Sequence, residues 1–525
     1  MSYAAHLRTI REINDKFCYY RTLEGLCRLD QWTALPKEGG AYRRNVTAHL
    51  AELKSALFAG EEARAAAEFF GNAGADGIDD YVERGLMREF LFRFRNAVRT
   101  PAGPAREAAL MKIDVMRAWE EARARDDFRV FLPWLERVFD VKRRIALAIA
   151  PDVPPFETLV GLTDEGADCA EIDREFARLA RGLTELISRI GASGVKPDTS
   201  AVDAELPPER LDAFARRLAR ESGYGESFGA FSHIVHGLTT RLGPRDSRVS
   251  TPLSGNLKII STYLHEAGHA IYSAGGNGRV NAANMWGGIV GGFHEGMARF
   301  NENMIGMSRA YWEHYYPQLC EEFPRFRGVP FDVFYAALNA VRPSPRRITA
   351  DEVTYSLHVI MRYELERDCI SGALAVSDVE ERWNDLSEEY LGLRPRSAVE
   401  GVLQDMHWAG DYVGYFQSYA LGNIYGGQIY ERLKHDLPQL DDCLRAGDFA
   451  TPNAWLDENI RQYGCCFTAG EMAQRLTGKR LDAAPFLRYL ERKYGELYGL
   501  DAEMRDFVDN SPLDKNGKLR LNRSQ

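Results

Sequence analysis

The pentapeptide His265-Glu266-Ala267-Gly268-His269 holds the side chains of this sequence that most clearly indicate chemistry. On an α-helix, residues four positions apart lie one turn above each other, so His265 and His269 can bind one metal ion. Glu266 would then lie close enough to act as general base on a water held by that metal. A five-residue pattern also arises by coincidence. The alternative is a core helix with two hydrogen-bonded histidines.

The residues around this pattern predict the helix that it requires. The stretch Leu257–Ser273 is largely apolar, with apolar residues at helical spacing, and Gly275-Gly276 provides a C-terminal stop. Gly268 costs the helix about 1 kcal/mol relative to alanine, which is expected where another element approaches closely.

A third metal ligand is needed, because a catalytic zinc site has three protein ligands and one open position for water. Glu295, next to His294, begins a second helical pattern that continues through Trp312. The glycine-rich connection Gly275–Gly292 could return this helix to the first one. From the residues alone, Glu295 is either a ligand or a first-turn acid that interacts favourably with the helix dipole.

Several further segments contain the residues that mark one known family. They are Leu29-Asp30-Gln31, Trp119, Asp126-Asp127-Phe128, Ala170–Asp173, Asp246–Ser250, Arg347–Asp351, Gly401–Trp408 and Gly414–Asn423. Together with the two histidine segments, they resemble the carboxypeptidase Taq family of zinc metallocarboxypeptidases over nearly the whole chain. The resemblance implies that His265, His269 and Glu295 are the metal ligands. It also implies that Glu266 activates a zinc-bound water as the nucleophile.

The resemblance implies further site residues around the metal. His236, or a phenol from Tyr419 or Tyr415, would stabilise the oxyanion that forms during hydrolysis. Arg347 would bind the free carboxylate of a peptide, because a guanidinium forms two parallel hydrogen bonds with this anion. Arg248 is the second candidate for this role.

Other roles for these residues stay open at this point. Arg347 could instead form a structural ion pair with Asp351, and Arg248 could form one with Asp246. Gln404 is expected to line the substrate groove or to support the residues that do.

Two short segments depart from the family pattern. His236-Gly237-Leu238 stands where the family has His-Pro-Phe, and Gly296-Met297-Ala298 stands where it commonly has Ser-Gln-Ser. The expected metal ligands are unaffected, so substrate preference is what these changes put in question. Two alternatives to a broad-specificity carboxypeptidase remain. One is a groove-type oligopeptidase that cuts internally, and the other is a zinc-stabilised peptide-binding protein without catalytic activity.

Composition excludes several other classes of protein. The 525 residues carry a formal net charge of −10, with acidic and basic residues interspersed, which argues against nucleic-acid or anionic-membrane partners. The first residues lack the apolar core of a signal peptide, and the eight cysteines lack paired spacing. We therefore expect a cytoplasmic enzyme. The resemblance implies a homodimer, short peptide substrates and Zn²⁺, with Co²⁺ or Mn²⁺ as possible substitutes.

The expected fold is a mostly α-helical peptidase with a long central groove and a small β element near the active site. Apolar periodicity predicts helices over Tyr3–Ala34, Tyr42–Ala59, Glu61–Phe70, Tyr81–Val98, Pro104–Arg123, Phe128–Ala150, Ala170–Ile190, Pro207–Glu221, Val353–Cys369 and Ala483–Tyr498. Extended segments are expected at Arg248–Thr251 and Arg279–Val290. We expect one domain over residues 1–510 and a flexible tail over 511–525.

Overall fold

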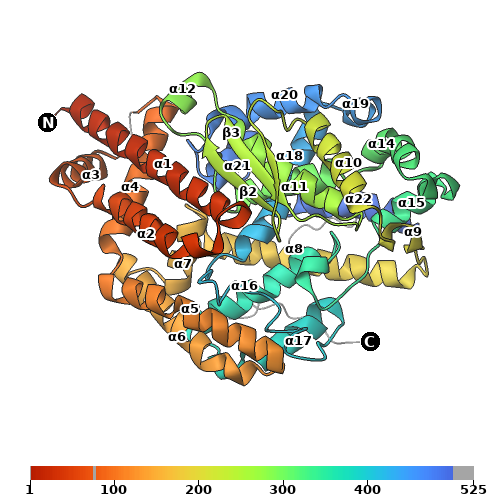
Figure 1. The fold of residues 1–525 in the computed structure, drawn as a ribbon, viewed down its shortest axis with the longest axis horizontal. Coiled ribbons are helices and arrows are strands. Elements are labelled where there is room, and N and C mark those ends of the chain that lie inside the picture. Colours follow the sequence, from red (N-terminus) through yellow and green to blue (C-terminus); the bar gives the residue numbers. More distant parts are fainter. Residues whose placement is uncertain (1, 75–77, 501–525) are drawn as a thin grey trace.

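The computed structural model describes residues 2–74 and 78–500, so the expected tail at 511–525 lies outside the described residues. The described chain is mostly helical with one small sheet (Figure 1). Its first half contains α1 (Tyr3–Thr33), α2 (Gly40–Ala56), α3 (Glu61–Ala73), α4 (Tyr81–Arg99), α5 (Ala102–Arg125), α6 (Leu132–Ile149), α7 (Pro155–Thr163), α8 (Cys169–Ala192), α9 (Ser200–Asp203), α10 (Pro208–Glu221), β1 (Phe231–His233), β2 (Leu238–Gly243) and β3 (Asp246–Thr251). Its second half contains α11 (Ile259–Ala274), α12 (Gly278–Ala282), α13 (Gly292–Arg299), α14 (Arg309–Glu322), α15 (Phe331–Leu338), α16 (Tyr355–Ser371), α17 (Val379–Leu391), α18 (Gln417–Asp436), α19 (Leu440–Ala446), α20 (Ala450–Asn459), α21 (Ala469–Thr477) and α22 (Ala484–Tyr498).

The helices predicted from periodicity all form, with ends that differ by a few residues. The expected strand at Arg248–Thr251 lies within β3, but the one at Arg279–Val290 is wrong. Asn277 accepts hydrogen bonds from the backbone amides of Arg279 and Val280, so it caps the short helix α12 instead. The helical pattern from His294 to Trp312 is also interrupted, because a π-helical segment, Phe300–Ile305, separates α13 from α14.

The sheet and α11 form one unit. β3 is the central strand, parallel to β1 and antiparallel to β2. The Thr239 hydroxyl of β2 lies 2.8 Å from the backbone carbonyl oxygen of Glu266, which places this strand directly against α11. The backbone of α11 is thereby fixed beside the sheet at the position where its histidines project.

Glycines allow three helices to approach each other closely. A Cβ on Gly268 of α11 would lie 2.9 Å from the Cα of Ala298 in α13. A Cβ on Gly422 of α18 would lie 2.7 Å from the Cγ of Glu295, which is also in α13. Glycine is therefore required at both positions. The expectation that Gly268 marks a close approach is confirmed.

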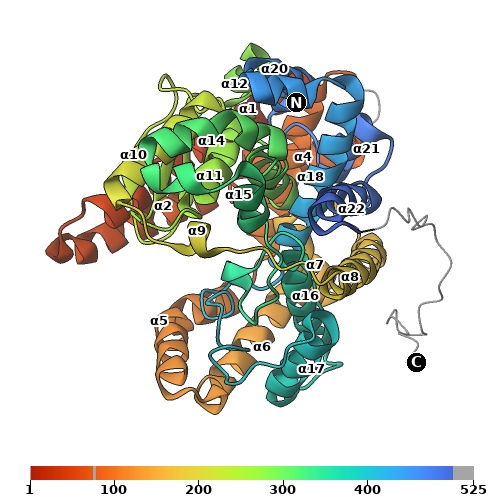
Figure 2. The same ribbon diagram turned by 90° about the vertical axis from the view of Figure 1, so that its right-hand side faces the viewer.

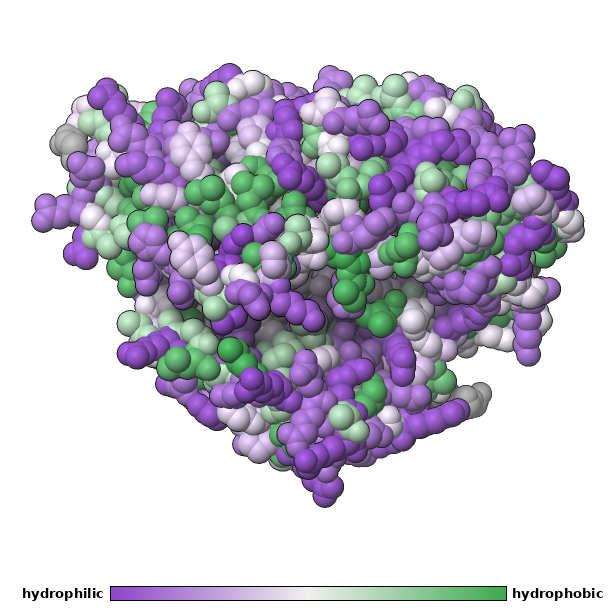
Figure 3. Space-filling model, in the orientation of Figure 1, coloured by the Kyte–Doolittle hydropathy of each residue, from purple (hydrophilic) through white to green (hydrophobic). Residues whose placement is uncertain are grey.

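The helices surround a hollow. α5, α6 and α17 form the lower part in Figures 1 and 2, whereas α11 and the sheet lie in the upper part. Figure 3 shows the surface hollowed between these two parts. A separate small core joins α1, α3 and α4 through residues such as Ile10, Phe70 and Phe90. Within the described residues, no helix is both long enough and apolar enough to span a bilayer.

Replacing Gly268 with alanine tests the packing of α11 on α13. Alanine favours a helix by about 1 kcal/mol, but overpacking at a rigid backbone contact costs about 1–3 kcal/mol. We expect the Gly268→Ala variant to unfold at a lower temperature and to retain less metal. The matched control is Gly495→Ala in α22, where a Cβ would meet nothing within 4 Å. A Gly268→Ala variant as stable as the control would contradict this account of the packing.

Candidate metal centre

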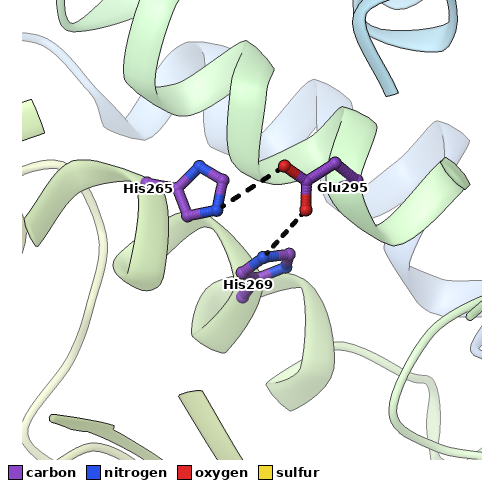
Figure 4. A group of neighbouring side chains, drawn as sticks. All are labelled: His265, His269 and Glu295. Carbon is purple, nitrogen blue, oxygen red and sulfur yellow. Dashed lines mark ion pairs between the residues drawn. The ribbon is translucent and has the colours of Figure 1, made fainter. Parts of the chain in front are cut away.

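Three side chains converge between α11 and α13 (Figure 4). His265 and His269 project from successive turns of α11, and Glu295 projects from the first turn of α13. The Nε2 of His265 lies 3.8 Å from Oε1 of Glu295, and the Nε2 of His269 lies 3.6 Å from Oε2. The potential ligand atoms all lie within 4.8 Å of one another. The structure thus brings together the three residues that were expected to bind the metal.

This group of donors suits a zinc ion. Two imidazole nitrogens and one carboxylate form a common set of ligands for catalytic zinc, with the fourth position open. Two bonds of about 2.0–2.1 Å at a tetrahedral angle separate their outer atoms by about 3.4 Å. The observed separations of 3.6 and 3.8 Å exceed this value by only a few tenths of an ångström. The candidate site therefore needs little rearrangement to hold the ion.

Charged neighbours orient His265 and Glu295. The Nδ1 of His265 lies 2.9 Å from the carboxylate of Glu302, which directs its Nε2 towards Glu295. Arg299 donates to both Glu295 and Glu302 at 3.1 Å. Burial alone would lower the pKa of His265, but the two carboxylates raise it to about 9. Burial likewise opposes ionisation of Glu295, yet His265 holds the pKa of this carboxyl well below its usual range.

A second histidine fixes the tautomer of His269. The Nε2 of His294 must donate a proton, because it lies 3.2 Å from the carbonyl oxygen of Gly287, which only accepts. Burial lowers the pKa of His294, which keeps the ring neutral and its Nδ1 an acceptor. The Nδ1 of His269, 2.7 Å away, must then be the donor. The lone pair of His269 therefore lies on Nε2, facing Glu295.

Glu266 is buried beside the metal ligands. Its Oε2 accepts a hydrogen bond of 2.7 Å from the hydroxyl of Thr239. A Cβ on Gly237 would lie 3.0 Å from its Oε1, so the segment that carries His236 passes next to this carboxylate. His236 itself is exposed and follows β1.

Arg347 lies in a buried ion-pair network beside the candidate site. Its Nε and Nη2 donate to Asp405, and its Nη1 donates to the hydroxyl of Tyr355 at 3.1 Å. Asp405 also accepts a 2.6 Å hydrogen bond from Arg362. Burial opposes ionisation of Asp405, but Arg362 and Arg347 hold its pKa well below the usual range. Two guanidinium groups thus share one carboxylate, which leaves the network with a net positive charge.

This network borders a cavity that reaches the metal centre. The cavity, about 400 Å³ in volume, is lined by Arg347, Arg299, Glu302, Tyr355 and His265, among others. The alternative ion pair of Arg347 with Asp351 does not form, because the partner is Asp405 instead. Gln404 supports Arg347 from behind, since its side-chain oxygen accepts from the Arg347 backbone amide at 2.8 Å.

The two expected phenols lie beside Arg347, whose guanidinium is 5.2 Å from the ring centroid of Tyr419. The Nε2 of His407 is 3.1 Å from the hydroxyl of Tyr419, and the rings of Tyr415 and Tyr419 are 5.5 Å apart. Burial raises the pKa of both phenols, and the charge of Glu295 adds to this effect. Both phenols therefore keep their protons and can donate hydrogen bonds near the metal centre.

Arg248 is engaged elsewhere. Its Nε and Nη2 each donate to Asp246 at 2.9 Å, which is the ion-pair alternative that the sequence left open. Its guanidinium fork is consequently occupied in the described structure.

The sequence did not identify Glu302, Arg299 or Thr239 as neighbours of the site. Arg299 is four residues after Glu295, and Glu302 is three residues after Arg299. This spacing is typical of side chains on one face of a helix and could have indicated that the three lie together. The contact between Thr239 and Glu266 had no comparable signal, because it depends on the placement of β2.

Replacing Glu302 with glutamine tests its role in orienting His265. The amide can still accept from Nδ1 but removes the negative charge, so we expect zinc affinity to fall by about 10–100-fold. Competition with a chromophoric chelator would measure this change. Glu52→Gln on α2, where the side chain is 77% exposed, is the matched control. Equal zinc affinity in the two variants would show that Glu302 does not support the metal.

Comparisons with known proteins agree with this site. Residues 9–494 match the family model described as carboxypeptidase Taq (M32) metallopeptidase. The chain is 34% identical to thermostable carboxypeptidase 1 of Thermus thermophilus, over 95% of this chain and 100% of that protein. It is 34% identical to carboxypeptidase 1 of Bacillus subtilis, over 76% of this chain and 80% of that protein. The crystal structure of an M32 carboxypeptidase from Deinococcus radiodurans covers 94% of this chain and 99% of its own, with a TM-score of 0.88 and 33% identity. The chain therefore belongs to the carboxypeptidase Taq (M32) family of metallopeptidases.

Proposed function

We propose that this protein is a zinc-dependent carboxypeptidase that releases C-terminal residues, with broad specificity, from short peptides. The observation that carries the proposal is the cavity that connects His265 with Arg347. The candidate metal centre and a buried cationic group thus border the same cavity, which is large enough for a small substrate. A free carboxylate at one end and a peptide bond at the other would fit this arrangement.

Glu266 is the proposed general base. A bound zinc ion supplies Lewis-acid chemistry, lowering the pKa of a water and polarising the carbonyl to be attacked. The buried Glu266 carboxylate accepts the proton of that water and later delivers it to the leaving amine. The hydroxyl of Thr239 holds Oε2 of Glu266 in place at 2.7 Å, which leaves Oε1 to move the proton.

Tyr419, Tyr415 and His236 are the proposed donors to the developing oxyanion. The two phenols are protonated and lie close to Glu295, and Tyr419 is oriented by His407. His236 lies on a segment that passes Glu266, and its exposed ring is free to turn towards a substrate. Donors positioned before the reaction stabilise the oxyanion without reorganisation.

Arg347 is the proposed anchor for the C-terminal carboxylate. Asp405 and Tyr355 fix its orientation, while the excess positive charge of the network favours an anion. Gln404 supports the anchor, and Arg248 is a poorer candidate because it does not line the cavity that Arg347 shares with His265. An anchored carboxylate limits cleavage to the end of the peptide. The hollow between the two parts of the molecule would admit short, extended peptides (Figure 3).

The remaining expectations form part of the same proposal. Co²⁺ or Mn²⁺ could substitute for Zn²⁺ at a site of two imidazoles and one carboxylate. A homodimer, and a single domain over residues 1–510, follow from the family resemblance and from the lack of any break in composition.

Replacing Glu266 with glutamine separates metal binding from turnover. The variant should retain zinc, because Glu266 is not among the three converging ligands, but lose about 10²–10⁴-fold in kcat without a base. Metal analysis and peptide hydrolysis would be measured on the same preparation. Full activity of the Glu266→Gln variant would rule out its assignment as base.

Removing Arg347 tests the carboxylate anchor. Arg362 still neutralises Asp405 in the Arg347→Ala variant, so the fold should survive. We expect kcat/KM for peptides with a free C-terminus to fall by roughly 30-fold or more, as for the loss of a buried charge pair. The neighbouring exposed arginine provides the matched control, Arg346→Ala, which should change little.

The same assay distinguishes the kinds of peptidase. The wild type should shorten free peptides one residue at a time and leave peptides with an amidated C-terminus intact. Equal cleavage of free and amidated peptides would instead identify an internally cutting oligopeptidase. An Arg347→Ala variant that loses activity on every substrate, together with thermal stability, would assign Arg347 a folding role.

A further inference from the structure

Arg241 is an arginine near the metal centre without an acidic partner. It lies on β2, two residues after Thr239, so both side chains project from the same face of the strand. Its Nη1 donates to the carbonyl oxygen of Gly287 at 3.1 Å. In the described part of the chain, no carboxylate pairs with it. Arginines that are largely buried are normally paired, so the charge of Arg241 is left without its usual partner.

A second arginine, Arg21, contacts the loop that contains Gly287 and has no acidic partner among the described residues. The guanidinium of Arg21, on α1, lies 4.5 Å from the ring centroid of Trp286, the residue directly before Gly287. Its Nη2 contacts the sulfur of Cys18, and no carboxylate within residues 2–74 and 78–500 forms an ion pair with it. Burial, followed by the charge of Arg21, lowers the pKa of Arg241 to about 10. Both arginines therefore contact the Trp286–Gly287 segment, and neither has a carboxylate partner among the described residues.

Arg241 contacts the metal centre through a different histidine from the one that shares a cavity with Arg347. Arg347 and His265 line one cavity. The Gly287 carbonyl accepts from both Arg241 and His294, and His294 contacts His269. His265 faces Oε1 of Glu295, whereas His269 faces Oε2 (Figure 4). Arg347 is thus linked to the metal centre through His265, whereas Arg241 is linked to it through His294 and His269.

We propose that Arg241, assisted by Arg21, binds an acidic side chain of the peptide on the amino-terminal side of the bond that is cut. The proposal rests on the function proposed above. With the terminal carboxylate at Arg347 and the scissile carbonyl at the metal centre, the preceding residues extend towards Arg241. A guanidinium fork matches a Glu or Asp carboxylate, and its charge selects against lysine. The enzyme accordingly prefers peptides with an acidic residue upstream of the scissile bond.

The test compares peptides that differ in one side chain. An acylated series carries Glu, Gln or Lys at the penultimate or the antepenultimate position, with the same C-terminal residue throughout. At one of these positions the wild type should favour Glu over Gln on the order of tenfold in kcat/KM, with Lys the poorest. Added salt should reduce this preference, because dissolved ions screen the attraction between the arginine and the carboxylate of the peptide.

Two variants show whether the preference for Glu peptides depends on Arg241. Arg241→Gln should bring the Glu-to-Gln ratio close to one, and Arg241→Glu should reverse the preference in favour of Lys. A misfolded protein cannot produce such a reversal. The matched control is Arg245→Gln, because Arg245 is exposed in the turn between β2 and β3. It should keep the wild-type ratio.

Equal rates for Glu and Gln peptides at both positions in the wild type would overturn the proposal. So would an Arg241→Glu variant that loses activity equally on all three peptides, since Arg241 would then only hold the Gly287 loop. Calorimetric binding of the same peptides to the Glu266→Gln variant separates this failure from a failure of the proposed function. A preference for Glu in binding would support the subsite even if the peptides were not cut.

Discussion

The structure depends on the close contact between α11 and α13, which brings an ionised carboxylate against two imidazoles. Glu295 is buried, and its negative charge is balanced by His265 and Arg299. Gly268 and Gly422 allow the helices on both sides to close on it. A divalent ion fits among these donors, and each imidazole is already oriented by a partner on its other nitrogen, Glu302 for His265 and His294 for His269. Such support fixes the ligand geometry before the metal binds.

Charge is distributed along the proposed path of the peptide in a consistent way. Arg347 and Arg362 share Asp405 at one end, so an anion is favoured there. Arg241 and Arg21 lack acidic partners at the other end, within the residues that the structure describes. Positive charge at both ends of this path would select peptides with a free terminus and with an acidic residue upstream. These two contacts would also fix the register of the peptide relative to the metal.

The sequence predicts those parts of the site that depend only on the residues within one helix. The spacing of the two histidines, the apolar residues around them and the stop at Gly275 were sufficient to define α11. Assigning Glu295 as a ligand required the family resemblance, because a first-turn acid also has a simpler explanation. The strand expected at Arg279–Val290 does not form, since the side chain of Asn277 caps a helix there. The sequence does not predict the contacts of Thr239, His294 and Arg241, because these contacts depend on how β2 and the Gly287 loop fold against α11.

X-ray diffraction at the zinc absorption edge tests the central claim most directly. Crystals of active, zinc-loaded protein should give one strong anomalous peak within bonding distance, about 2.0–2.2 Å, of His265 Nε2, His269 Nε2 and the Glu295 carboxylate. A peak at a different group of residues, or active protein with no peak between these side chains, would contradict the account.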